Sequence, residues 1–81
     1  LVRYRALEAL EDPAHAATAR ALLSDEMGFV RRAAASALGR LRDVPAKVPL
    51  ERMAEREGDL AARVEALRAL GLIAACGKGG P

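Results

Sequence analysis

Apolar positions recur along the chain in three similar segments, at residues 2–10, 30–41 and 62–73. In the middle segment they fall at i, i+4, i+7, i+8 and i+11, which is the spacing of one buried stripe on an α-helix. The stripe consists of Val30, Ala34, Ala37, Leu38 and Leu41. The third segment repeats it with Ala62, Ala66, Ala69, Leu70 and Ile73. Each segment therefore predicts an amphipathic helix whose apolar side needs a neighbour.

The three segments align residue by residue. Arg3, Arg31 and Arg63 share one position, separated by 28 and then 32 residues. Other matched sets are Ala6, Ala34 and Ala66; Ala9, Ala37 and Ala69; and Leu10, Leu38 and Leu70. Periods of roughly 20–50 residues are typical of solenoids, in which each repeat buries its apolar face against the next one. The matched alanines are where we expect neighbouring helices to come closest.

A second helix precedes the middle copy and completes a helical hairpin. Pro13 suits the first turn of this helix, where its missing N–H costs nothing, and Asp12 before it can act as a cap. The helix is expected to run to about Leu23, followed by a turn that ends at Gly28. We expect three of its residues to face inward: Ala17, Ala21 and Leu22.

The next hairpin begins less regularly because Pro45 and Pro49 interrupt the chain. Pro49 is expected to open a helix that is followed by a turn at Gly58 and Asp59, and Asp59 suits the N-cap of the last helix. The pattern as a whole predicts about five helices, at 2–11, 13–23, 28–42, 49–57 and 59–75.

This order of elements predicts an all-α fold in which helical hairpins stack side by side. We assign residues 1–76 to the repeat domain, as a half repeat followed by two whole repeats, and residues 77–81 to a flexible, glycine-rich tail. Repeat arrays normally end in polar caps, whereas residues 1–2 and 72–75 are apolar. We therefore expect further chain or another copy of the protein to cover the ends. A homo-oligomer joined through these ends remains an alternative.

The stretch from Asp25 to Leu41 is the most specific part of the pattern. Its distinctive residues, with those of the third copy, are Asp25, Val30-Arg31, Ala37-Leu38-Gly39, Glu57, Ala62-Arg63 and Ala69-Leu70-Gly71. This arrangement resembles the HEAT-like repeat of the phycobilisome-lyase type over most of residues 2–75. The resemblance implies a right-handed α–α superhelix, a HEAT-like solenoid, in a family of bilin lyases and adaptor proteins. The third copy departs from the family pattern at Glu57, where Asp is usual, and at Ala62, where Val is usual.

Composition and charge narrow the classes of function. Aromatic residues make up 2% of the chain, and the net charge is +2 with no basic run longer than Arg31-Arg32, which argues against a nucleic-acid partner. No stretch approaches the ~20 apolar residues needed to span a bilayer, so we expect no membrane contact. The single cysteine excludes an internal disulfide and favours the cytoplasm, and the abundance of Ala and Arg suggests a bacterial source.

No set of residues predicts catalysis, a cofactor or a metal site. His15 has no cysteine or second histidine near it, and Cys76, near the end of the last helix, has no His or Asp within reach by sequence. Residues 51–57 alternate acids with arginines, which is typical of an ordinary charged helix surface. The aligned residues Arg3, Arg31 and Arg63, here called the arginine column, could bind anions. A structural role is favoured, in which each arginine bonds to the acid or carbonyls of an adjacent turn. The acids concerned are Asp25 and Glu57.

The exposed face of the repeated helices is the candidate binding surface. Register places its residues side by side along a concave groove, where solenoids usually bind. The expected contact residues are Tyr4, Glu8, Arg32, Ser36, Arg40, Val64 and Arg68. We therefore expect a non-catalytic scaffold or adaptor that binds another protein. The alternative is an accessory fragment of a bilin-lyase-like enzyme.

Overall fold

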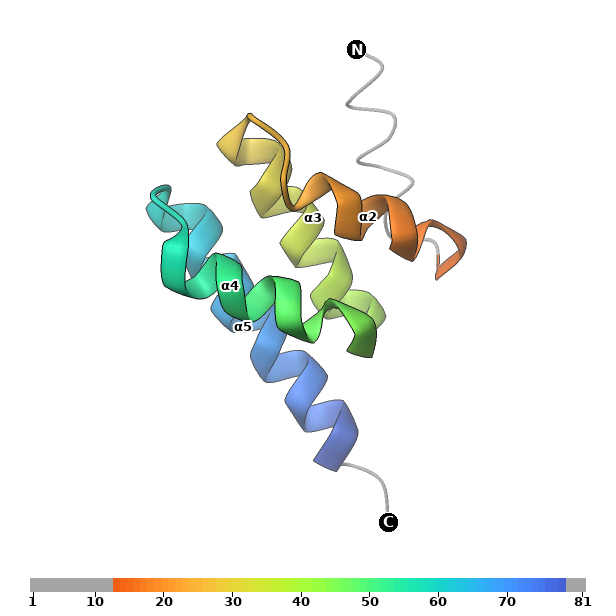
Figure 1. The fold of residues 1–81 in the computed structure, drawn as a ribbon. Helices are drawn as coiled ribbons and strands as arrows, with labels where there is room; N and C mark the ends of the chain where they lie inside the picture. The colour runs from red at the N-terminus through yellow and green to blue at the C-terminus, as the bar shows by residue number, and fades with distance from the viewer. Residues whose placement is uncertain (1–12, 79–81) are drawn as a thin grey trace.

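The computed structural model describes residues 13–78, whose helices lie in two layers (Figure 1). One layer begins with a short 3₁₀ turn, η1 (Pro13–His15), which leads directly into α2 (Ala16–Leu22). The same layer contains a second 3₁₀ turn, η2 (Val44–Ala46), which leads into α4 (Lys47–Arg56). Each 3₁₀ turn carries a proline, which a helix tolerates in its first turn because the N–H groups there have no acceptor within the helix.

The other layer consists of α3 (Gly28–Leu41) and α5 (Leu60–Lys78), which lie side by side and make the most extensive contact between helices. α2 packs on α3 and α4 packs on α5, so that two helical hairpins stack on each other. Within residues 13–78 there is no β-strand, and no helix has the length and apolar character needed to cross a bilayer. This architecture confirms the all-α repeat fold. The helix expected at 2–11 lies outside the described residues.

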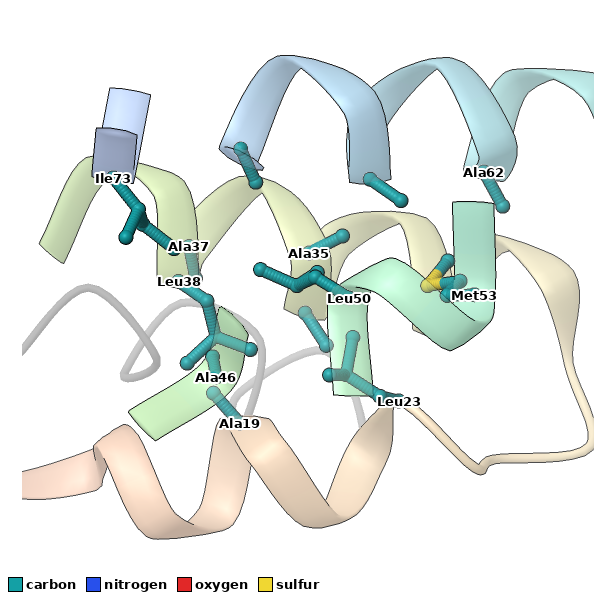
Figure 2. Close-up of a cluster of buried hydrophobic side chains, with 13 residues drawn as sticks. Ala19, Leu23, Ala35, Ala37, Leu38, Ala46, Leu50, Met53, Ala62 and Ile73 are labelled. Carbon is teal, nitrogen blue, oxygen red and sulfur yellow. The ribbon is translucent and has the colours of Figure 1, made fainter. Parts of the chain in front are cut away.

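The core lies between the two layers and contains most of both predicted stripes, whereas Leu41 and Leu70 are half-buried. Val30, Ala34, Ala37 and Leu38 of α3 are buried, as are Ala62, Ala66, Ala69 and Ile73 of α5. Figure 2 shows these helices meeting residues of the other layer, which are Ala19, Leu23, Ala46, Leu50 and Met53. Alanine supplies half or more of these buried residues on each helix, so the helices approach closely and the core needs no aromatic side chain. The periodicity of the sequence therefore identified the inward faces of α3 and α5 correctly.

The two repeats come close together at Gly39 of α3 and Ala69 of α5. A Cβ atom added at Gly39 would lie 2.8 Å from the Cα atom and 2.9 Å from the Cβ atom of Ala69. The repeat-equivalent glycine of α5, Gly71, has no neighbouring atom within 4 Å of such a Cβ. Ala35 and Leu67 are likewise equivalent, and Ala35 is fully buried whereas Leu67 is 55% exposed. α5 thus covers a face of α3 whose counterpart on α5 itself is open within the described residues.

The prediction for the inward face of α2 was wrong at Ala17 and Ala21 and correct at Leu22, which packs against the core. Ala17 and Ala21 are exposed, whereas Ala19 and Leu23 are buried in the core and Leu22 is half-buried. Alanines on every side of this helix leave no contrast between apolar and polar faces. In addition, the tighter 3₁₀ geometry of η1 changes the angular register of the residues that follow it.

Helix boundaries also differ from those predicted. α4 begins at Lys47, so that Pro49 is its third residue, still in the first turn where a proline is tolerated. α5 continues to Lys78, past the boundary at which the flexible tail was expected to begin, and residues 79–81 lie outside the described part. The cap at Asp59 is confirmed, because its Oδ1 atom accepts a hydrogen bond of 3.2 Å from the backbone N–H of Ala62.

The end of α3 has a left-handed residue, Arg42, with φ of 51°. The N–H of Asp43 bonds to the carbonyl of Leu38, and that of Arg42 bonds to the carbonyl of Gly39. These two bonds form the Schellman motif, in which glycine is the usual left-handed residue. The motif reverses the chain and directs Asp43 toward α2, where it meets Arg20.

Candidate functional site

The two repeats are joined by an ion pair between Arg31, in the first turns of α3, and Glu57, in the turn before α5. Nε and Nη2 of Arg31 donate to Oε1 and Oε2 of Glu57 at 2.5 Å and 2.9 Å, a bidentate geometry. The Glu57 side chain is only 5% exposed. The hydrogen bond from Arg31 lowers the pKa of Glu57, and the same bond raises the pKa of Arg31. Both groups are therefore held in their charged forms.

Other bonds of the arginine column end on backbone carbonyls. Nη1 of Arg31 donates to the carbonyls of Asp25 at 2.7 Å and Glu26 at 3.0 Å, and Nε of Arg63 donates to that of Ala54 at 2.8 Å. The structural interpretation of the column is thus confirmed at its second and third positions. Arg3 lies outside the described residues.

The acids of the two turns have equivalent local roles. Asp25 Oδ1 accepts a hydrogen bond from the N–H of Met27 at 2.9 Å, and Glu57 Oε2 accepts one from the N–H of Asp59 at 3.0 Å. Glutamate can therefore replace aspartate in the third copy without loss of this bond. Its longer side chain also reaches Arg31. From the sequence, Glu57 was placed both among the exposed charges of residues 51–57 and among the acids that the aligned arginines bond. Its burial makes the first assignment wrong, and its bonds from Arg31 confirm the second.

A second ion pair ties the two hairpins together. Nη1 of Arg20 in α2 donates to Oδ2 of Asp43 at 2.6 Å, and the Asp43 side chain is 12% exposed. Sequence analysis did not identify this pair. The two residues are 23 positions apart and share no repeat register, so no pattern in the chain connects them.

A shallow groove of about 160 Å³ runs between α3 and α5 on the layer that they form. Its lining residues are Ser36, Arg40, Glu65, Arg68, Ala69 and Leu72. Ser36 and Arg68 occupy equivalent positions of consecutive repeats, as do Arg40 and Leu72. Nη1 of Arg68 lies 3.4 Å from Oε1 of Glu65, and the Arg68 side chain is 67% exposed. The structure thus brings together three of the predicted contact residues, Ser36, Arg40 and Arg68.

The other predicted contact residues lie elsewhere. Arg32 and Val64 are exposed but do not line the groove between α3 and α5. An α-helix has 3.6 residues per turn, so positions four apart do not stay on one line along it but rotate gradually around its axis. Positions at one end of such a row therefore line the groove, whereas those at the other end lie beside it. Tyr4 and Glu8 lie outside the described residues.

A larger groove, of about 550 Å³, lies between α2 and α4 on the opposite layer. Its lining residues are Arg20, Leu23, Ser24, Arg31, Pro49, Arg52, Met53, Arg56 and Glu57. The groove exists because α2 and α4 make far less contact with each other than α3 and α5 do. The sequence pattern did not predict this groove, because the distance between α2 and α4 is set by the packing of α3 against α5.

The described residues offer no constellation for metal chemistry, because no group of three or more His, Cys, Asp or Glu side chains could hold an ion. His15 is half-buried at the end of η1, immediately before α2. The backbone of Cys76 lies within α5.

Comparisons with known proteins agree with this geometry. The family model described as HEAT repeats matches residues 1–71, which is most of the chain and includes α2, α3, α4 and the first part of α5. No curated protein and no solved structure matches the chain. Repeated amphipathic helices, stacked hairpins and this match lead to one conclusion: the chain belongs to the HEAT-repeat family.

Proposed function

We propose that this chain is a non-catalytic scaffold that binds another protein along the groove between α3 and α5. The supporting observation is that consecutive repeats line the groove with equivalent positions, Ser36 with Arg68 and Arg40 with Leu72. Such a surface extends with each repeat added, which is how solenoids generate long binding faces. HEAT repeats are commonly protein-interaction scaffolds, and the family match supports the same role.

The side chains of the groove suit a polar, modest interface. Arg40 and Arg68 provide guanidinium groups, which are enriched at protein interfaces, while Ser36 and Glu65 provide short polar contacts. The pair between Arg68 and Glu65 is long and its arginine is largely exposed, so it contributes little to folding. Arg68 can therefore turn toward a partner at small cost. The low aromatic content removes the usual anchors of a tight interface.

The direct test is site-specific photo-crosslinking in cells. A benzophenone amino acid replaces Ser36 in one variant and Val48 in a matched control, since Val48 is 54% exposed on α4 and lines neither groove. We expect a covalent adduct with a second protein from position 36 and none from position 48. The identified partner is then purified, and it should bind the wild type but not Arg40→Glu/Arg68→Glu. Equal crosslinking from both positions would contradict the proposal.

The phycobilisome-lyase type of the repeat leads to the alternative function, an accessory fragment of a bilin-lyase-like enzyme. Bilins change their visible absorbance when a protein holds them in an extended conformation. Free bilin added to the purified chain should then give a shifted spectrum if this alternative is correct. If the bilin spectrum is unchanged and the crosslinking experiment captures a protein partner, the results support the scaffold function and not the alternative.

A further inference from the structure

The groove between α2 and α4 carries more positive charge than its neighbours neutralise. Four arginines line it, at positions 20, 31, 52 and 56. Arg20 is paired with Asp43, and Arg31 is paired with Glu57. Arg52 and Arg56, both exposed, have no ion pair or hydrogen-bond partner among residues 13–78. Two guanidinium groups therefore face the groove without a counter-charge in the described chain.

The charges of α4 are segregated between two faces. Arg52 and Arg56 lie four residues apart, so they stand one above the other on the side of the groove. Glu51 and Glu55 have the same spacing on the neighbouring, exposed face and do not line the groove. Like charges at this spacing destabilise a helix, whereas alternating charges would stabilise it. The arrangement thus concentrates positive charge on the side of α4 that lines the groove.

The rest of the groove adds an apolar floor and fixed walls. Leu23, Pro49 and Met53 lie along it between the arginines. The ion pairs of Arg20 and Arg31 hold α2 and the two turns in place, so the groove is formed before any ligand arrives. Its volume of about 550 Å³ falls within the range of roughly 300–1,000 Å³ that is usual for ligand sites.

We propose that this groove is a second binding site, specific for an acidic peptide segment in which carboxylates flank an apolar side chain. The carboxylates would meet Arg52 and Arg56, and the apolar residue would lie on the floor beside Met53. A nucleic acid fits less well, because two unpaired arginines can neutralise few phosphates and the acids of α4 lie next to them. The site is on the opposite layer from the groove between α3 and α5, so it is independent of the proposed scaffold surface.

Fluorescence anisotropy with defined probes tests the proposal. The ligand is a labelled peptide of sequence Gly-Glu-Asp-Leu-Glu-Asp-Gly, and its isosteric control carries Gln and Asn in place of Glu and Asp. A third probe is a labelled oligothymidine of similar length. We expect the chain to bind the acidic peptide, more weakly as salt is added, and to bind the amide peptide and the oligothymidine at least several-fold less. Absent binding of the acidic peptide, equal binding of the amide peptide, or tighter binding of the oligothymidine overturns the proposal.

Two variants of equal charge locate the site. Arg52→Gln/Arg56→Gln removes two positive charges from the groove, and Arg32→Gln/Lys47→Gln removes two exposed positive charges from outside it. The first variant should weaken peptide binding roughly tenfold, and the second by less than about twofold. Thermal denaturation should show both folded, since removal of a like-charge pair does not destabilise α4. An equal loss of affinity in the two variants would mean that the peptide responds only to net charge, and it would refute the site.

Discussion

Arg31 and Glu57 form a bidentate ion pair that links the turn before α3 to the turn before α5, with the Glu57 carboxylate almost fully shielded from water. The same guanidinium bonds to the carbonyls of Asp25 and Glu26. One side chain thus connects the turns of two consecutive repeats. Because the pair is shielded, it should contribute more to stability than the exposed pairs of the same chain.

Replacement of Glu57 by Gln should lower the free energy of unfolding by about 2 kcal/mol at neutral pH, since it leaves Arg31 without its counter-charge. Glu55→Gln, a neighbouring exposed position, should change stability by less than about 0.5 kcal/mol. Urea denaturation of the three proteins measures both values. Equal effects of the two substitutions would show that the pair does not stabilise the stack.

The same pair predicts a dependence of stability on pH. The pKa of Glu57 is lower in the folded chain than in the unfolded one, because of the bond from Arg31. Its contribution is therefore fully present above its unfolded pKa and is lost as the pH falls through the lower folded pKa. Between neutral pH and pH ~3 the wild type should lose more stability than Glu57→Gln. Parallel loss in the two proteins would contradict this assignment.

The two repeat-equivalent glycines should respond in opposite directions to the same substitution. Gly39→Ala places a Cβ against the backbone of Ala69 and should cost about 1–3 kcal/mol, because the helices must separate. Gly71→Ala meets no atom and should add up to about 1 kcal/mol through better helix propensity. Thermal denaturation of both variants measures the difference. The same sign for both would mean that α3 and α5 are not in close contact at this point.

Arg42 is strained in its left-handed conformation, so Arg42→Gly should stabilise the chain by about 0.5–1 kcal/mol. The hydrogen bond from Nη1 of Arg42 to the carbonyl of Arg40 is exposed, and its loss should cost little. Arg42→Ala is the control, because it removes the side chain and keeps the strain. Equal melting temperatures for the glycine and alanine variants would exclude strain as the cause.

The open face of α5 should promote self-association. Leu60, Val64 and Leu67 are exposed on this face, and Leu67 is equivalent to Ala35, which α5 covers on α3. We expect a second copy to cover it, so that the mass measured by light scattering rises with concentration. Leu60→Gln/Leu67→Gln should keep the chain monomeric, whereas Val48→Gln, at an exposed apolar residue of α4, should not. A wild-type mass that stays constant with concentration would rule this association out.

Features that depend on local pattern could be predicted from the sequence alone. The stripes through Val30 and Ala62 identified the buried faces of α3 and α5, because a helix repeats its faces every few residues. The cap at Asp59 and the structural role of Arg31 also depend on nearby turns. The pattern failed at α2, where Ala17 and Ala21 are exposed, since alanine is equally compatible with either face.

Features that depend on the distance between helices were decided only in three dimensions. The pair of Arg20 with Asp43 and the groove beside Arg52 involve elements that no periodicity connects. Burial of Glu57 likewise follows from the position of Arg31 in the preceding repeat, and the order of residues within either segment does not reveal how close the two side chains lie. Repetition along the chain thus determined which helices stack, whereas the close contact of Gly39 with Ala69 shows how tightly α3 and α5 pack within their layer, a distance on which the meeting of charged side chains from consecutive repeats depends.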